Sequence, residues 1–328
     1  MSASSQIKKR TIVLLLIVLA CGCNSLSFER EENPASPAGT LSRSTTPFVP
    51  TPPISFNSND SSYSSSEPSV VFAVIGDYGT GDQIAGEVAD LVKSWQPEFI
   101  ITTGDNNYPS GSQATIDNAV GKFYNNFIFP YQGDFGEGAD QNRFFPSLGN
   151  HDWLTAGAEP YLNYFALPGN ERYYDFTWGH LLQFFVLDSD PNEPDGVRSD
   201  SRQAAWLEQR MAGSNATWKI VYMHHPPFSS GRQGSVEYMR WNFKEWEADA
   251  VLSGHDHFYE RLIKRRLVYF VNGLGGDDAY EFDHPLVGSQ VRFNADHGAM
   301  RVEATKHKIT FQFITRTGEV IDTYEIER

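Results

Sequence analysis

The sequence from residue 70 to residue 77 reads Val70-Val71-Phe72-Ala73-Val74-Ile75-Gly76-Asp77, an apolar run that ends at a glycine and a carboxylate. Such a continuous run predicts a buried strand. A second run, Phe99-Ile100-Ile101-Thr102-Thr103, ends at Gly104-Asp105, and residues 85–95 between the two runs have the spacing of an amphipathic helix. We therefore expect a strand–helix–strand unit. Both aspartates then stand at carboxyl ends of strands, where α/β folds place their chemistry.

Three further segments place polar ligands after apolar runs. They are Gly149-Asn150-His151-Asp152, Gly254-His255-Asp256-His257 and the pair His224-His225. Carboxylate oxygens, amide oxygens and imidazoles suit Mn, Fe or Zn. Both cysteines lie near the N-terminus, at Cys21 and Cys23, so thiolate ligands and disulfides are excluded from the body of the chain.

The rest of the chain predicts a two-sheet sandwich. A helix is expected around 116–127 and another over 201–211, capped by Ser199, Asp200 or Ser201. Residues 173–176 and 181–187 predict paired strands, and 218–223 and 250–253 predict buried ones. Antiparallel strands are expected at 267–271, 299–305, 309–314 and 320–326. The expected fold class is α/β, with two mixed β-sheets flanked by helices over residues 70–328.

The N-terminus has the features of an export signal. Lys8-Lys9-Arg10 precede an apolar segment, Ile12 to Ala20, that is too short for an ordinary membrane span. Val18-Leu19-Ala20-Cys21 resembles a bacterial lipobox, with Cys23 as the second possible lipidation site. We expect residues 1–23 to be a lipoprotein signal peptide, and the protein to be anchored facing the periplasm or exterior. A plain secretory signal or an uncleaved anchor is the alternative.

Residues 24–69 are rich in Ser, Pro, Thr and Asn, a composition that predicts a disordered tether. An ordered additional pair of strands is the alternative. The formal net charge of the chain is −15, which argues against nucleic acid as a partner. A phosphate-bearing substrate would have to be held by local metal charge. No protein partner is indicated.

The ordered motifs resemble the calcineurin-like metallophosphoesterases over about residues 70–328. Among these, Gly104-Asp105-Asn106-Asn107-Tyr108 most resembles the small, tartrate-resistant type of purple acid phosphatase. The resemblance implies one metal bound by Asp77, Asp105, Tyr108 and His257, and another bound by Asp105, Asn150, His224 and His255. It also implies Fe(III), held by the Tyr108 phenolate, beside Fe, Zn or Mn. If Tyr108 is instead a core aromatic, two divalent ions such as Mn or Zn are expected.

The resemblance further implies in-line attack of a metal-bound hydroxide on phosphorus. His151 would stabilise charge or protonate the leaving group, and Asp152 would orient His151. The family's second substrate-side histidine is replaced here by Gln233. The neighbouring Arg232 could bind a phosphate oxygen instead.

Other residues that imitate the motifs are given ordinary structural roles. Asp188 is predicted to form hydrogen bonds at a strand end, and His225 to be a neighbour of a ligand. His284 and His297 are expected in loops, and His297 is a candidate to line the pocket. Trp206, Leu207 and Met211 are expected in the core beneath a helix.

The sequence thus predicts an exported two-metal phosphatase that hydrolyses small phosphomonoesters. One alternative is a Mn- or Zn-dependent phosphodiesterase or nucleotide pyrophosphatase, favoured if Tyr108 binds no metal and the loop at 133–142 leaves the cleft open. The other is a non-catalytic surface lipoprotein that binds phosphate ligands or a partner protein.

Overall fold

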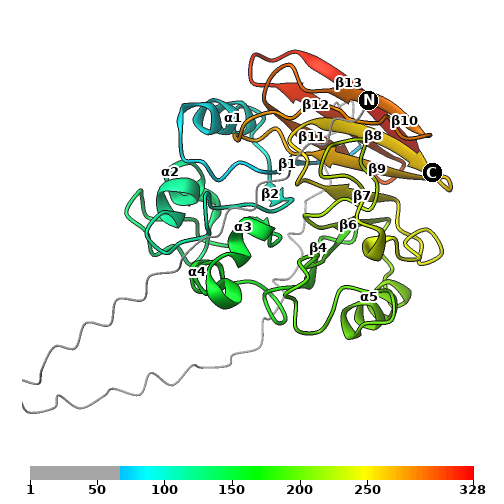
Figure 1. Cartoon of the computed structure of the whole chain (residues 1–328), viewed down its shortest axis with the longest axis horizontal. Helices are drawn as coiled ribbons and strands as arrows, with labels where there is room; N and C mark the ends of the chain where they lie inside the picture. Colours follow the sequence, from blue (N-terminus) through cyan, green and yellow to red (C-terminus); the bar gives the residue numbers. More distant parts are fainter. Residues whose placement is uncertain (1–66) are drawn as a thin grey trace, which may run out of the picture. The chain divides into compact units, whose positions relative to one another are not determined.

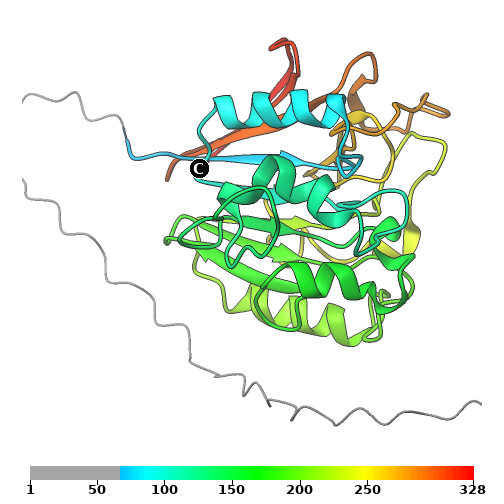
Figure 2. The same ribbon diagram turned by 90° about the vertical axis from the view of Figure 1, so that its left-hand side faces the viewer.

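Two β-sheets lie face to face, with helices on their outer sides (Figures 1 and 2). The structure is a computed structural model that describes residues 67–328. One sheet has the strand order β13-β12-β11-β1-β2-β3, and the other has the order β10-β8-β9-β7-β6-β5-β4. The predicted sandwich of two mixed sheets is therefore confirmed.

The first sheet comprises β1 (Val70–Ile75), β2 (Phe99–Thr102), β3 (Phe144–Pro146), β11 (Gly298–Ala304), β12 (Lys308–Thr315) and β13 (Val320–Glu327). The second comprises β4 (Tyr174–Trp178), β5 (Leu182–Val186), β6 (Trp218–Tyr222), β7 (Ala250–Ser253), β8 (Tyr259–Lys264), β9 (Leu267–Asn272) and β10 (Ser289–Phe293). The α-helices are α1 (Gln83–Ser94), α2 (Lys122–Tyr124), α3 (Asn150–Trp153), α4 (Glu159–Tyr164) and α5 (Arg202–Ala212). A π-helix forms η1 (Asp117–Gly121), and short 3₁₀-helices form η2 (Asn125–Phe127), η3 (Ala156–Ala158) and η4 (Glu237–Met239).

Alternation along the second sheet divides its side chains between two buried layers. Phe184 of β5 and Tyr222 of β6 belong to the core that contains Phe72 of β1 and Phe99 of β2. Their neighbours along the strands point the other way and join the layer that includes Leu207 of α5. Figure 2 shows α1 on the outer face of the first sheet and α5 on the opposite side of the molecule. Since both faces are covered, β5 and β6 are buried at every position and are mostly apolar, as is usual for parallel strands.

Parallel pairing brings the carboxyl ends of several strands to one edge of the sandwich. β1, β2 and β3 run parallel to one another in the first sheet. β5, β6, β7 and β9 are likewise parallel neighbours in the second. The polar motifs follow β1, β2, β3, β6 and β7, so all of them emerge at the ends of parallel strands.

Most predicted elements are present, with small changes at their ends. Ser201 is the N-cap of α5, where its hydroxyl accepts a hydrogen bond from the Ala204 amide at 3.1 Å. The predicted helix at 116–127 is divided into η1, α2 and η2. One prediction is wrong in part: β9 is antiparallel to β8 but parallel to β7, because it lies inside the second sheet rather than in a terminal meander. Strands β8 and β10 and helices α3 and α4 were not anticipated.

The structure begins to describe the chain at residue 67. The predicted signal peptide at 1–23 and all but the last residues of the predicted tether lie outside the described residues. Within residues 67–328, none of the helices combines the length and the apolar character needed to cross a bilayer.

Candidate metal centre

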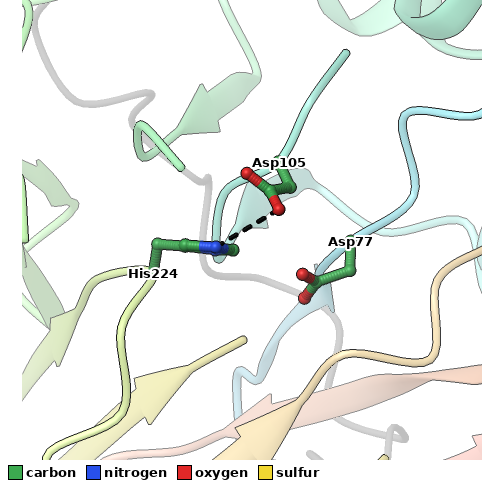
Figure 3. A group of neighbouring side chains, drawn as sticks. All are labelled: Asp77, Asp105 and His224. Carbon is green, nitrogen blue, oxygen red and sulfur yellow. Dashed lines mark ion pairs between the residues drawn. The ribbon is translucent and has the colours of Figure 1, made fainter. Parts of the chain in front are cut away.

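Polar side chains from both sheets meet where the parallel strands end. Figure 3 shows Asp77, Asp105 and His224 converging from three separate segments. Each of the three offers a ligand atom, and these atoms all lie within 4.8 Å of one another. All three side chains are essentially inaccessible to solvent. Two carboxylates and an imidazole at this spacing could hold a metal ion.

One group of ligand atoms gathers around the Tyr108 hydroxyl. This oxygen lies 3.1 Å from Asp105 Oδ2, 3.4 Å from Asp77 Oδ1 and 3.2 Å from His257 Nε2. His257 Nε2 in turn lies 3.4 Å from Asp77 Oδ1. The four residues that the resemblance assigns to the first metal are thus brought together.

A second group gathers around His224 Nε2. This nitrogen lies 3.3 Å from Asp105 Oδ2, 2.9 Å from Asn150 Oδ1 and 3.2 Å from His255 Nδ1. These are the four residues that the resemblance assigns to the second metal. Asp105 Oδ2 belongs to both groups, which is the position that a bridging carboxylate must occupy.

Hydrogen bonds outside the two groups orient their members. His224 Nδ1 donates to the Thr103 carbonyl at 2.8 Å, and His257 Nδ1 donates to the Asp278 carbonyl at 2.9 Å. Each bond fixes the tautomer and leaves Nε2 as the free ligand atom. Backbone amides of His151 and His255 donate to the carboxylates of Asp105 and Asp77, respectively. The donor set therefore fits metal ions, because its oxygens and imidazole nitrogens are of the right kind and several of them are held in place by hydrogen bonds.

The backbone at the ligands is unusual. Asp77, Asp105 and His255 have φ values of 55°, 51° and 72°, which are left-handed conformations that L-residues seldom adopt. Backbone strain of this kind clusters at functional sites. Gly104 has a φ of 93°, and a Cβ there would lie 2.7 Å from His224 Nδ1. Only glycine lets the strand end approach the imidazole so closely.

Charges within the site shift its proton equilibria strongly. Burial lowers the pKa of His224, but the carboxylates of Asp105 and Asp77 outweigh burial and raise this pKa to about 10. The same ion pair lowers the pKa of Asp105, although burial acts in the opposite direction. Burial and the charge of His224 lower the pKa of His255 to about 4. The site thus favours a positive charge beside Asp105, which a bound cation would supply in place of the His224 proton.

Burial and the carboxylates of Asp105 and Asp77 raise the pKa of Tyr108 well above its usual value. Loss of the phenol proton here requires a strong positive charge next to the oxygen. A trivalent ion such as Fe(III) supplies more of that charge than a divalent one.

His151 lies at the edge of the centre, with its ring centroid 4.5 Å from that of Tyr108. The prediction that Asp152 orients this ring does not match the contacts. His151 Nδ1 donates to the Pro109 carbonyl, while Asp152 Oδ2 accepts hydrogen bonds from the Gly149 amide and from Asn106. Asp152 is buried beneath the turn, so it stabilises the loop that carries Asn150 and His151 rather than the imidazole itself.

Arg232 and Gln233 lie exposed on the loop after β6. The Gln233 backbone amide donates to Asp256 Oδ1 at 3.2 Å. The Arg232 guanidinium lies over the ring of Tyr280, 5.2 Å from its centroid, and Tyr280 stacks on His257 at 4.0 Å. Tyr280 was not anticipated, because it stands in an irregular loop with no motif around it.

Most residues that were given structural roles have the contacts expected of them, but Trp206 does not lie in the core. Asp188 accepts hydrogen bonds from the Trp153 indole and from the Asp190 amide at the end of β5. His225 is hydrogen-bonded to Ser189, and His284 is an exposed loop residue paired with Asp283. His297 contacts the Asp277 carbonyl. Leu207 and Met211 are buried under α5, whereas Trp206 is only partly buried.

Comparison with known proteins identifies the family. The profile of the family described as calcineurin-like phosphoesterase matches residues 70–259, which is more than half of the chain. The chain belongs to the calcineurin-like phosphoesterases. Purple acid phosphatase 17 of Arabidopsis thaliana is 27% identical over 255 residues, covering 66% of this chain and 71% of that protein. Human tartrate-resistant acid phosphatase type 5 is 23% identical over 297 residues, covering 77% of this chain and 89% of that protein.

Solved structures with the same fold include the purple acid phosphatase PPD1 from yellow lupin seeds. It has a TM-score of 0.63 at 17% identity and covers 80% of this chain and 54% of that chain. Another is GAP50, the anchor in the inner membrane complex of Plasmodium, with a TM-score of 0.61 at 21% identity, covering 79% and 89%. The family match and the similarity to purple acid phosphatases support the conclusion that this protein is a metal-dependent phosphoester hydrolase. They also imply a binuclear metal centre.

Metal binding should release a proton. Because the pKa of His224 is about 10 without a cation, the ring is protonated at pH 7 and must lose that proton to become a ligand. We expect the logarithm of the apparent Mn²⁺ affinity of chelator-treated protein to rise by about one per pH unit between pH 7 and 9. Calorimetry in buffers of different ionisation enthalpy measures the released proton. His225→Gln should retain this release, and metal binding without proton release at pH 7 would contradict the assignment.

Proposed function

We propose that this phosphoesterase is an exported two-metal phosphatase that hydrolyses phosphomonoesters. The observation that carries the proposal is the position of Asp105, whose Oδ2 lies 3.1 Å from the Tyr108 hydroxyl and 3.3 Å from His224 Nε2. One carboxylate oxygen shared by two groups of ligands can hold two cations about 3.5–4 Å apart. At this distance both ions can contact a single phosphate.

Seven residues would hold the two ions: Asp77, Asp105, Tyr108 and His257 for the first, and Asp105, Asn150, His224 and His255 for the second. Fe(III) is proposed at the first position, because Tyr108 is present, and Fe, Zn or Mn at the second. When bound, the ions would polarise the phosphorus–oxygen bonds and acidify the attacking water for an in-line displacement. Asn150 contributes a neutral ligand, which limits the negative charge that an anionic ester must approach.

His151 is the proposed proton donor to the leaving alkoxide. Its Nδ1 is already engaged with the Pro109 carbonyl, so Nε2 is the nitrogen available to a substrate. The ring is partly exposed beside Tyr108, which places it at the mouth of the centre rather than among the ligands. A histidine in this position can transfer a proton without leaving its hydrogen bond.

The rival functions use the same fold. A phosphodiesterase or nucleotide pyrophosphatase would use two divalent ions such as Mn or Zn and would need no phenolate, so metal binding by Tyr108 separates it from the phosphatase. The likeness to GAP50 is a likeness of fold, and function has to be argued from the site. A purely binding role would be supported by a missing ligand, yet all seven residues are present and converge.

Asp105→Asn tests the shared carboxylate. We expect the kcat for phenyl phosphate to fall by at least about a hundredfold, because loss of the bridging charge removes several kcal/mol of transition-state stabilisation. Asp188→Asn is the matched control, since Asp188 is also a buried aspartate that follows a strand, but its carboxylate accepts hydrogen bonds from Trp153 and Asp190 and not from a proposed ligand. Equal activity in the wild type and Asp105→Asn would disprove the two-metal proposal.

Tyr108→Phe tests the identity of the first metal. The full-length protein purified without added metal should show a visible absorption band from phenolate-to-Fe(III) charge transfer, and this band should be absent from Tyr108→Phe. The buried Tyr124→Phe serves as a control that removes a phenol from the core. A colourless wild type that contains two divalent ions would favour the phosphodiesterase alternative. The proposal of a two-metal centre would still stand.

Export and lipid anchoring rest on the N-terminal sequence alone. The basic residues, the short apolar segment and Val18-Leu19-Ala20-Cys21 support lipidation at Cys21. In bacterial cells, Cys21→Ser should move the protein from the membrane fraction to the soluble fraction, whereas Cys23→Ser should leave it membrane-bound. The reverse result would assign the lipid to Cys23, and membrane binding by both variants would indicate an uncleaved anchor.

A further inference from the structure

The guanidinium of Arg232 lies at the rim of the metal centre, and the ring of Tyr280 lies between it and His257. Tyr280 stacks on His257 with a centroid separation of 4.0 Å and an interplanar angle of 15°. Since His257 covers one face of the phenol ring, the Arg232 guanidinium, 5.2 Å from the ring centroid, lies over the other face. Arg232 is therefore separated from the first group of ligands by the thickness of a ring.

The Arg232 guanidinium is available to a ligand. Among residues 67–328, no carboxylate lies within 4.0 Å of it, in contrast to Arg240, which pairs with Glu237 at 3.0 Å on the same loop. A guanidinium held over an aromatic ring keeps its edge free for bidentate hydrogen bonds to a carboxylate or phosphate.

A buried carboxylate, that of Glu260, helps to fix the two loops that carry Arg232 and Tyr280. Glu260 accepts hydrogen bonds from the amide and hydroxyl of Ser230. The Ser230 hydroxyl and carbonyl in turn bind the amides of Leu286 and Asp283 in the Tyr280 loop. Glu260 is fully buried, so this connection is shielded from water. The fold thus holds the backbone of both loops, and the exposed Arg232 side chain lies over the Tyr280 ring that these loops bring next to it.

We propose that Arg232 and Tyr280 form a subsite for a second acidic group of the substrate, distinct from the phosphate that is hydrolysed. This inference rests on the proposed phosphatase function and names its substrate class: phosphomonoesters of alcohols or phenols that carry a further anionic group. The ring between Arg232 and His257 keeps the guanidinium away from an oxygen bound at Asp105. It instead faces the part of the ester that projects outward past His257.

The negative charges around Arg232 narrow the class of substrate that this subsite could accept. Asp277 lies 3.8 Å from His257 Nδ1, and Asp278 and Glu281 are exposed on the same loop. Together with a net charge of −15, these carboxylates repel anions that do not reach Arg232 directly. One carboxylate or phosphate at the far end of the ester fits this arrangement, and a polyphosphate chain does not.

The test compares two esters of the same shape, 4-carboxyphenyl phosphate and 4-carbamoylphenyl phosphate, on the full-length metal-loaded protein. We expect kcat/KM to favour the carboxylate by about threefold to fivefold, the effect of a partly exposed ion pair. Arg232→Gln should abolish this preference, and Arg232→Lys should retain part of it. Arg240→Gln should keep it, because that guanidinium lies over Phe228 rather than Tyr280. The corresponding aryl phosphonates, which are not hydrolysed, should show the same preference in their Kd values by calorimetry.

Each outcome separates the subsite from the catalytic centre. If the wild type hydrolyses both esters equally, or if Arg232→Gln slows both by the same factor, the subsite is disproved and the phosphatase function stands. If the metal-loaded wild type hydrolyses neither ester, the proposed function fails and the subsite fails with it. A preference lost equally in Arg240→Gln would show a general charge effect rather than a site at Arg232.

Discussion

The structure depends on one carboxylate oxygen that two sets of ligands share. Asp105 Oδ2 faces the partly buried Tyr108 on one side and the fully buried His224 on the other. Buried negative charge of this density is unfavourable without a compensating cation. The raised pKa of His224 and the raised pKa of Tyr108 are two responses to that requirement. Metal ions satisfy it more completely than protons do, because each can bind several of these oxygens and nitrogens at once.

The sandwich supplies the frame for that arrangement. Asp77 and Asp105 follow strands of the first sheet, while His224, His255 and His257 follow strands of the second. Glycine allows the close approach of the two edges at Asp77 and His255, because a Cβ at Gly254 would collide with the Asp77 carboxylate. The left-handed backbone at Asp77, Asp105 and His255 then turns each side chain inward. Fold and site are thus specified by the same short segments.

Much of the fold and of the ligand positions could be predicted, because an apolar run indicates a buried strand from the local sequence alone. The runs before Asp77 and Asp105 predict buried strands, and parallel strands bring their ends together. Strands β8 and β10 were missed because charged residues such as Glu260 and Arg261 interrupt their patterns. Tyr280 and the contacts of Asp152 were also beyond prediction, since both depend on how irregular loops pack. The meeting of Tyr108 with His257 spans 149 residues and came from family resemblance rather than from spacing.

The division of the ligands between two sheets links the metal centre to the aromatic core far below it. Phe72 and Phe99 of one sheet pack against Phe184 of the other, with centroid separations of 5.2 Å and 5.4 Å to Phe184. These rings set the gap between the sheets, and the gap in turn sets how far Asp105 lies from the imidazoles. The aromatic core therefore determines the spacing between the ligands that come from the two sheets. Evolution could adjust metal–metal separation, and with it reactivity, by changing ring size at positions that no substrate ever touches.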